Sequence, residues 1–357
     1  QAMVNCLEAE GVETVFGYPG ATICPFYDAL SRSSIRHILV RTEQNAGHAA
    51  NGYARITGRP GVCVVTSGPG ATNLITGIST AYMDSIPMVI ITGQVVSSLL
   101  GSDVFQEVDI TGACEPFIKH SYLLKDPART AQVLIDIPMD VQKMQVNFSY
   151  PKEVSIRSYK PTSKGHPGQI KKAAAALFEA KRPLIVAGGG VFSAGAEKEL
   201  LAFSQKAAVP VVNTLMGIGA VPADYPLRLG MIGMHGIRPA NYAVHQADLL
   251  ILAGSRVADR AIPSPDLLAR HKKIIHQILS ELCELAEPSW AENWAAWREE
   301  LVGVAKKYRP DYGKRDGYVN PKLLMHQLNA MAGEGTTIVS DVGQNQMWSA
   351  NEFAEIG

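Results

Sequence analysis

A glutamate stands where a predicted strand gives way to a predicted helix. Residues 35–40 (IRHILV) form an apolar run of strand length, and residues 46–54 are rich in alanine and glycine, which suits a helix packed closely against a neighbour. Glu43 lies between them. Because ligands of α/β sheets gather at the carboxyl ends of strands, this carboxyl group is well placed to act on a ligand. The alternative is that Glu43 only satisfies first-turn amides and the helix dipole.

Two glycine-containing turns follow other predicted strands. GYPG (17–20) follows a strand at 12–16, while SGPGATN (67–73) follows a buried strand at 61–66 and leads into a helical stretch ending at Ala81. Turns of this kind let the backbone approach a ligand, and a strand, glycine turn and helix in succession can bind rings or anions through main-chain amides. Taken singly, each motif is only moderately specific, since most Pro-Gly pairs are simply turns.

Helices and strands alternate around these turns. Further helices are predicted at residues 2–10 and 25–31, and a third buried strand, IPMVIIT, at residues 86–92. Buried strands that alternate with helices imply a parallel sheet covered on both faces. The sequence therefore predicts an α/β fold with a doubly wound parallel sheet.

Composition limits the classes of function. The 357 residues exceed the size at which one core keeps growing, so two or more domains are expected. With zero net charge, 46% hydrophobic and 18% charged residues, nothing favours a nucleic-acid partner. No apolar run approaches the roughly 18 residues of a membrane span. The five scattered cysteines suit a reducing cytosol, and the nine histidines show no metal-ligand spacing. We therefore expect a cytoplasmic protein with no membrane or nucleic-acid partner.

Four segments, in their order and spacing, resemble the pyrimidine-binding domain of thiamine-diphosphate enzymes. They are FGYPGA, RTEQNAGHAANGYAR, VTSGPGATN and IPMVIITGQV. Within that superfamily, the chain looks most like the family of acetohydroxyacid (acetolactate) synthase large catalytic subunits. The segments DVFQE (103–107), FIKHSY (117–122) and LIDIPMDVQ (134–142) agree with that family, and the likeness extends with interruptions from Gln1 to Gly357.

The resemblance implies a transferase of two-carbon units in branched-chain amino acid biosynthesis. Such an enzyme decarboxylates pyruvate on thiamine diphosphate and ligates the hydroxyethyl carbanion to a second 2-ketoacid. In the family, the glutamate that matches Glu43 hydrogen-bonds the aminopyrimidine and favours the imino tautomer, which removes the thiazolium proton. The resemblance also places Phe105, Gln106 and Lys119 near cofactor and substrate as catalytic residues. For Lys119 and its neighbour His120, an ordinary solvated loop pair is the alternative.

The resemblance further implies the residues that contact thiamine diphosphate. They are Pro19, Gly20, Glu43, Thr66, Gly68, Asn73, Gly343, Gln344 and Asn345. Gly20, Gly68 and Asn73 are interpreted as loop geometry and support rather than chemistry. The family more often has His where Asn345 stands, but Asn can still donate hydrogen bonds. The family's magnesium motif, GDG followed by Asn, is expected downstream of Gly357, so no metal ligand is predicted within this chain.

Three doubly wound parallel-sheet domains are predicted in total. The pyrimidine-binding domain spans 1–147, a linker rich in Pro, Ser and Lys spans 148–168, a central Rossmann-like domain spans 169–308, and an incomplete diphosphate-binding domain begins at 318–357. The shortened stretches at 124–134 and 271–279 lead us to expect segments of a longer protein. The alternative is a real truncation that could not hold its cofactor.

The central domain carries the segments that imply FAD. RPLIVAGGG (182–190) reads as a strand and glycine turn but lacks the full GxGxxG and its acidic partner, whereas GMIGMHG (230–236) and GSRVADR (254–260) match the family. The implied FAD residues are Gly188, Gly189, Gly190, Met234, His235, Gly254, Arg256 and Arg260. In the family the flavin has no net redox role. Because many relatives keep this fold without a flavin, purely structural roles are the alternative.

Other readings and partners follow from the same resemblance. The nearest rival is another thiamine-diphosphate lyase or oxidase, of the pyruvate oxidase or oxalyl-CoA decarboxylase type, although GMHG and FQE favour the synthase. Glu43 argues against glyoxylate carboligase, which lacks that carboxylate. A non-catalytic nucleotide-binding scaffold is the reading if the truncation is real. Because different subunits of these enzymes hold the two ends of the cofactor, we expect a homodimer or tetramer with interfacial sites, and a small regulatory subunit is a possible partner.

Overall fold

The described part of the chain divides into two compact units. The computed structural model describes residues 1–124, 134–150, 164–256, 258–262, 273–275, 279–310, 312–313, 317–333 and 336–353. Unit 1 spans Gln1–Tyr159 and unit 2 spans Lys160–Gly357, so the boundary falls inside the segment predicted as a linker. Whether residues 318–357 begin a third domain stays a prediction.

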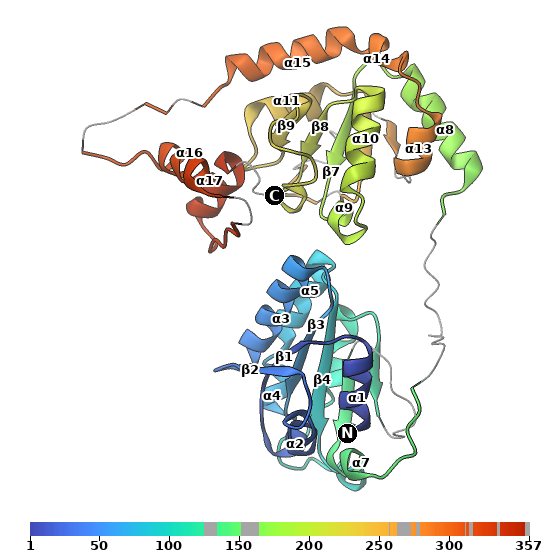
Figure 1. Ribbon diagram of the computed structural model, residues 1–357, viewed down its shortest axis with the longest axis vertical. Coiled ribbons are helices and arrows are strands. Elements are labelled where there is room, and N and C mark those ends of the chain that lie inside the picture. The colour runs from blue at the N-terminus through green and yellow to red at the C-terminus, as the bar shows by residue number, and fades with distance from the viewer. Residues whose placement is uncertain are drawn as a thin grey trace. The chain divides into compact units, whose positions relative to one another are not determined.

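Unit 1 is built on a six-stranded parallel sheet (Figure 1). Its strands are β1 (Thr14–Tyr18), β2 (Arg36–Leu39), β3 (Gly61–Val65), β4 (Met88–Gln94), β5 (Ser121–Leu123) and β6 (Leu134–Pro138). Their order is β2-β1-β3-β4-β6-β5, and every neighbouring pair is parallel. Every residue of β3 and β6 is buried, as strands covered on both faces require. The predicted parallel sheet is confirmed.

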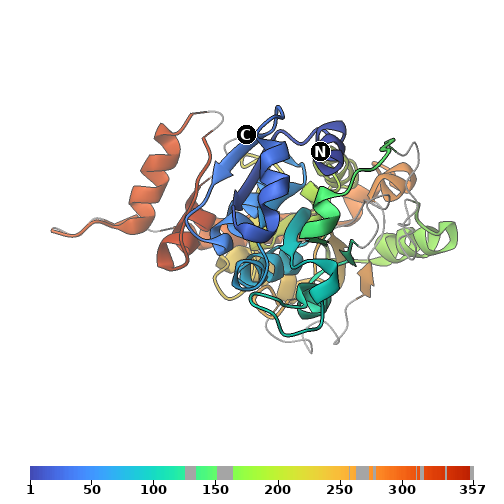
Figure 2. The same ribbon diagram turned by 90° about the horizontal axis from the view of Figure 1, so that it is seen from below.

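Helices cover both faces of this sheet (Figure 2). They are α1 (Ala2–Ala9), α2 (Cys24–Leu30), α3 (Glu43–Thr57), α4 (Pro69–Thr72), α5 (Ile75–Asp84), α6 (Ile110–Cys114) and α7 (Met139–Lys143). Residues of α1, α2 and α7 pack on one face in a core with Val62 and Val64. Residues of α3, α5 and α6 pack on the other face with Cys63 and Val65. Successive side chains of β3 point to opposite faces of the sheet, so they contribute alternately to the two cores.

Helix α3 packs tightly against α5 because glycines meet where the helices cross. A Cβ added to Gly77 would lie only 2.9 Å from the Cα of Gly47. Thr42 begins α3 by accepting a hydrogen bond from the amide of Asn45, and Gly58 ends it in the left-handed region with φ +68°. The small residues that suggested a close helix contact thus fix the position of α3, and with it the position of Glu43.

Unit 2 contains a second parallel sheet, with five strands. These are β7 (Pro183–Ala187), β8 (Val211–Asn213), β9 (Arg228–Met231), β10 (Leu249–Ala253) and β11 (Lys273–Ile275), in the order β11-β10-β7-β8-β9. Its helices are α8 (Pro167–Glu179), α9 (Gly190–Ser193), α10 (Glu197–Ala207), α11 (Arg238–Gln246), α13 (Leu279–Leu285), α14 (Trp290–Asn293) and α15 (Ala295–Lys307). The indole nitrogen of Trp297 donates to the carbonyl of Pro183, which attaches α15 to the start of β7, and that of Trp294, between α14 and α15, donates to the carbonyl of Ala180 at the end of α8.

The last described residues form two packed helices, α16 (Pro321–Met331) and α17 (Gln344–Glu352). The strand predicted from the sequence TTIVSD (336–341) is wrong: these residues are not in a strand, and Val339 is 90% exposed. An extended segment becomes a strand only when a neighbour accepts its backbone hydrogen bonds, and no described strand pairs with it. Most of the two shortened stretches, at 125–133 and at 271–272 and 276–278, lies outside the described residues.

Candidate active site

The carboxyl ends of β1, β2 and β3 meet at one edge of the first sheet. The chain passes from β1 to β2 on one side and then returns to β3 on the other side. The β1–β3 pair is therefore a topological switch point, where loops diverge and leave room for a ligand. Pro19 and Gly20 follow β1, Glu43 opens the helix after β2, and Thr66 and Gly68 follow β3. The structure thus brings these predicted residues to one edge.

Glu43 is the half-buried first residue of α3. The Nδ2 amide of Asn73 donates a hydrogen bond of 2.9 Å to its Oε2. Its Oε1 lies beside Gly70, since a Cβ added there would be 3.4 Å away. The carboxyl group therefore faces the loop after β3 and is held by a neutral amide that brings no opposing charge. This arrangement suits a group that exchanges a proton with a ligand.

Glycines allow the loops at this edge to pack in close contact. A Cβ on Gly20 would lie 2.5 Å from the Cβ of Thr66, and a Cβ on Gly68 would lie 2.8 Å from the Cα of Gln106. Gly68 also has φ +59°, which a larger residue rarely adopts. These two glycines therefore allow close packing of the loops, and their contact with thiamine diphosphate stays a prediction.

A hydroxyl network joins the loops after β1 and β3, and of its members only Thr66 was among the predicted site residues. The hydroxyls of Thr22 and Thr66 lie 2.9 Å apart, and the backbone amide of Ser67 donates to the Thr22 hydroxyl at 3.0 Å. The side chain of Gln142 donates to the Thr22 carbonyl at 2.7 Å. Hydroxyl residues beside each glycine turn were the available signal.

The remaining predicted catalytic residues are placed differently from one another. The backbone of Gln106, with φ +60°, contacts the β3 loop, whereas the side chain of Phe105 is 87% exposed. Lys119 is exposed and precedes β5, so it lies at the amino edge of the parallel sheet, opposite to Glu43. Unit 1 by itself therefore brings Gln106 to the Glu43 edge and does not bring Lys119 there. The catalytic role of Lys119 stays a prediction.

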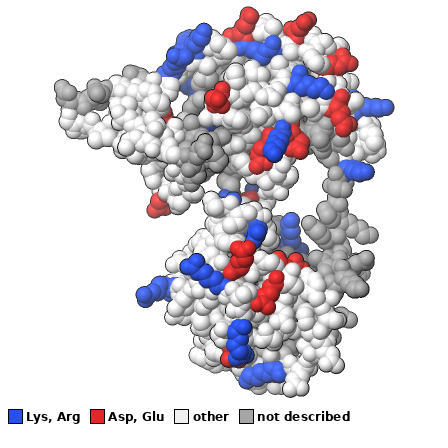
Figure 3. Space-filling model, in the orientation of Figure 1, with Lys and Arg blue, Asp and Glu red and all other residues white. Residues whose placement is uncertain are grey.

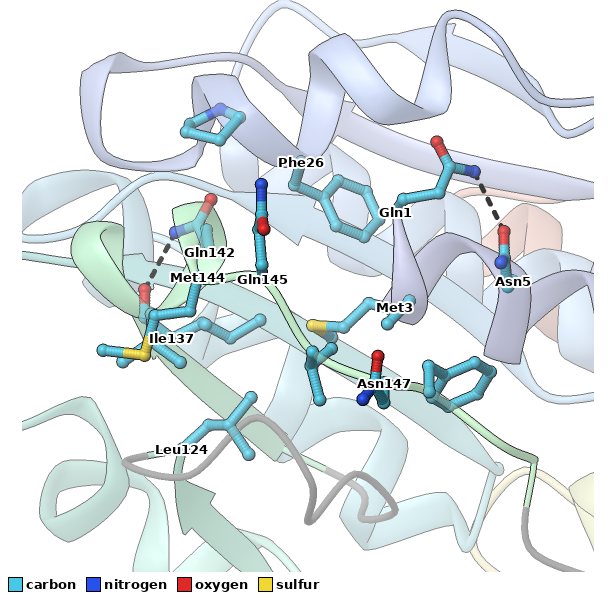
Figure 4. Close-up of a pocket in the computed structure, with 15 residues that line it drawn as sticks. Gln1, Met3, Asn5, Phe26, Leu124, Ile137, Gln142, Met144, Gln145 and Asn147 are labelled. Carbon is cyan, nitrogen blue, oxygen red and sulfur yellow. Dashed lines mark hydrogen bonds between the residues drawn. The ribbon is translucent and has the colours of Figure 1, made fainter.

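A separate pocket of about 730 Å³ lies elsewhere in unit 1 (Figure 4). Met3, Phe26 and Ile137 supply apolar surface, and Gln142 and Asn147 supply amides. None of the described residues that line it carries a charged side chain, and none belongs to the predicted site. Its chemistry does not fit a diphosphate, so the Glu43 edge is the candidate active site.

In unit 2, the predicted FAD glycines lie at the switch point between β7 and β10. The amides of Gly188 and Gly190 donate to the carbonyls of Ala253 and Gly254, each at 2.9 Å. A Cβ on Gly190 would lie 2.7 Å from the Cα of Gly254, whose own φ is +56°. The two turns therefore pack backbone against backbone. This packing supports the structural alternative for three of the glycines; the fourth, Gly189, faces Met216 instead.

The loops after β9 and β10 also meet at this edge. The amide of Met234 donates to the carbonyl of Arg260 at 3.0 Å, and Asn241 bonds both backbone groups of Gly233. The side chains of four predicted FAD residues are exposed there: Met234, His235, Arg256 and Arg260. Two of them carry charge that could face a phosphate.

The predicted diphosphate turn opens α17 in unit 2. Gly343 is the N-cap residue, with φ +152°, and Gln344 and Asn345 form the first turn and are exposed. Backbone amides at a helix start can bind an anion. Among the described residues, no group of His, Cys, Asp or Glu could hold a metal ion.

The described part of the chain has a surface of mixed charge and no membrane-crossing helix. On the face drawn in Figure 3, Lys and Arg intermix with Asp and Glu, with no broad basic surface. No described helix combines the length and hydrophobicity that a membrane crossing requires.

Known proteins of similar sequence match both units. The family described as "Thiamine pyrophosphate enzyme, N-terminal TPP binding domain" matches residues 1–113, and "Thiamine pyrophosphate enzyme, central domain" matches residues 170–280. A probable acetolactate synthase large subunit of Methanocaldococcus jannaschii is 42% identical over 99% of this chain and 68% of its own length. The acetolactate synthase large subunit of Buchnera aphidicola is 40% identical, covering 98% and 69%. That of Corynebacterium glutamicum is 40% identical, covering 98% and 63%.

Proposed function

Because the chain belongs to the family of acetolactate synthase large subunits, we propose that its Glu43 edge binds and activates thiamine diphosphate for acetolactate synthesis. The reaction is the decarboxylation of pyruvate and the transfer of the two-carbon unit to a second 2-ketoacid. The observation that carries the proposal is the carboxyl group of Glu43, held by Asn73 at the switch point of the sheet.

The residues at this edge fit the pyrimidine end of the cofactor. When bound, thiamine diphosphate supplies a carbon centre that adds to the ketone and accepts the electron pair released by decarboxylation. Glu43 would hold the pyrimidine ring through its carboxyl group, which can hold or release a proton. Asn73 orients this carboxyl group from Oε2, and the half-buried position strengthens a charge-assisted hydrogen bond.

Substitution of Glu43 by glutamine tests this role. Glutamine keeps an oxygen that can accept from Asn73, so the fold and much of the cofactor affinity should persist, while kcat for acetolactate formation falls by about 10²–10⁴-fold. The matched control is Glu13→Gln, which removes a carboxyl paired with Arg59 on the exposed surface of the same unit. Near-normal kcat in Glu43→Gln would refute the assignment. Acetate or acetaldehyde as the product of the unaltered protein would instead favour a sister oxidase or lyase.

We further propose that unit 2 binds FAD, with the side chains of Arg256 and Arg260 facing its phosphates. These arginines follow β10, next to the glycine turn of β7. Arg260→Ala should weaken FAD binding about tenfold, the size expected for a lost charged hydrogen bond. Flavin fluorescence measures this directly, and Lys198→Ala on exposed α10 is the control. Equal FAD affinities in the two variants would contradict the proposal.

The assembly and the metal complete the proposed enzyme. We propose a cytoplasmic homodimer or tetramer with sites at subunit interfaces, magnesium bound with the diphosphate, and Gly343, Gln344 and Asn345 near the phosphates. Relatives named as large subunits support a small regulatory subunit as a partner. Sedimentation velocity with and without thiamine diphosphate and magnesium tests the assembly, and a monomer under both conditions would refute it.

A further inference from the structure

A buried polar cluster bridges two central strands of unit 1. Thr92 and Gln94 lie on β4, and Asp136 lies opposite Thr92 on β6, each at most 2% exposed. The Thr92 hydroxyl donates to Oδ1 of Asp136 at 2.6 Å, and Nε2 of Gln94 donates to its Oδ2 at 2.9 Å. Burial raises the pKa of Asp136 to about 7. Burying a carboxyl group in a sheet costs free energy that burying an apolar side chain would not cost.

Gln94 connects this carboxyl group to the segment that follows β4. Its Nε2 also donates to the carbonyl of Val108 at 2.8 Å, and its Oε1 accepts from the amide of Val95 at 2.9 Å. A glutamine amide can present either its oxygen or its nitrogen in a given direction. Because Oδ2 of Asp136 accepts the hydrogen bond from Nε2, the carboxyl group selects the orientation in which Nε2 also reaches the carbonyl of Val108.

The segment held at Val108 carries Gln106 to the candidate active site. Gln106 has φ +60°, a conformation that costs a non-glycine residue of order 1 kcal/mol and persists only when its surroundings impose it. The Cα of Gln106 closely approaches Gly68, which follows β3 beside Thr66. A direct chain of contacts therefore runs from Asp136 through Gln94 and Val108 to the loop at the Glu43 edge.

We propose that Asp136 is a positioning residue for acetolactate synthesis, acting through Gln94 and Val108 to set Gln106 against Gly68. The inference rests on the proposed function of the Glu43 edge. The carboxyl group does not touch the ligand. It orients the amide that anchors the segment, and the segment places Gln106.

The test is Asp136→Asn, alone and combined with Gln106→Ala. The asparagine side chain has one acceptor oxygen instead of two, so it cannot accept from both Thr92 and Gln94, and the hydrogen bond that directs Nε2 of Gln94 toward Val108 is weakened or lost. We expect kcat/KM for pyruvate to fall about 10–100-fold, as a misplacement of order 1 Å can produce. In the Gln106→Ala background, Asp136→Asn should change kcat/KM less than about twofold, since the group it positions is gone. Asp28→Asn, on exposed α2, is the control.

A purely structural role would give a different result. It would lower the thermal midpoint and reduce kcat/KM by the same factor in both backgrounds, and this additivity would overturn the proposal. Unchanged kcat/KM in folded Asp136→Asn would also overturn it. If Asp136→Asn does not fold, Thr92→Val removes one donor to the carboxyl group at nearly constant shape, and the same cycle applies with a smaller effect. Failure of the proposed function is distinct, because it appears as an active Glu43→Gln enzyme.

Discussion

The close approach of α3 and α5 leads to a prediction with a matched control. In Gly77→Ala, the new Cβ would lie 2.9 Å from the Cα of Gly47 and 3.1 Å from its carbonyl carbon. Both are backbone atoms, which cannot rotate away as the end of a side chain can. The helices must therefore separate, and α3 carries Glu43 at its first residue. The substitution should reduce both stability and activity.

The expected loss of stability is the difference between two terms. Overpacking of this kind costs roughly 1–3 kcal/mol. Replacing glycine by alanine inside a helix stabilises the folded state by about 0.5–1 kcal/mol. The net loss then lies between about 0 and 2.5 kcal/mol, with a central value of about 1.3 kcal/mol. For a unit of this size, 1 kcal/mol shifts the thermal midpoint by roughly 2–4 °C, so a decrease of about 2–5 °C is expected.

Gly52→Ala, on α3, measures the gain in helix propensity alone, because it creates no new contact with a neighbouring helix. Gly52 is exposed, and a Cβ there would meet nothing within 4 Å. This variant should gain about 0.5–1 kcal/mol, a rise of roughly 1–4 °C. Calorimetry of the intact chain measures both midpoints, and acetolactate formation reports the position of Glu43. If Gly77→Ala were stabilised as much as Gly52→Ala, the reasoning about the helix crossing would be refuted.

Two further predictions concern buried polar groups in unit 1. The pKa of Asp136 is raised from 3.8 to about 7, so the folded state binds its proton more tightly than the unfolded state does. Its contribution to the unfolding free energy is therefore largest below pH 4 and falls, by a few kcal/mol, as pH rises to 7. Urea unfolding across this range should show that decline relative to Asp136→Asn, and parallel profiles would contradict it. Tyr27→Phe removes the donor to the Val64 carbonyl at 2.7 Å and should cost about 1–3 kcal/mol in denaturant unfolding, whereas an unchanged midpoint would show that water replaces this bond.

The local sequence predicted much of the architecture. Buried apolar runs of strand length, separated by helical segments, were sufficient to predict a parallel α/β sheet, because this periodicity reflects burial on both faces. The prediction was wrong for residues 336–341, whose composition is that of a strand. Composition reports a preference for extended backbone, whereas a strand also needs a partner for its hydrogen bonds.

For the candidate site too, the sequence predicted some features and others could be seen only in the structure. Motif spacing placed Glu43 and the glycine turns after successive strands, and strand order then brought them to one edge. The role of the glycines could be seen only in the structure, where Gly20 and Gly68 allow loops to pack against Thr66 and Gln106. Residue types alone could not distinguish close contact with a ligand from close contact with another loop.

The sequence by itself determined the fold class, the family and the position of Glu43 at a strand end, because each depends on local pattern and spacing. Only the tertiary structure decided which distant groups meet. Asp136 follows Gln94 by 42 residues yet accepts its hydrogen bond, because β6 pairs directly with β4. The direction of the strands likewise separates Lys119 from the Glu43 edge within unit 1. The order and direction of strands arise from packing of the whole unit, which no short segment encodes.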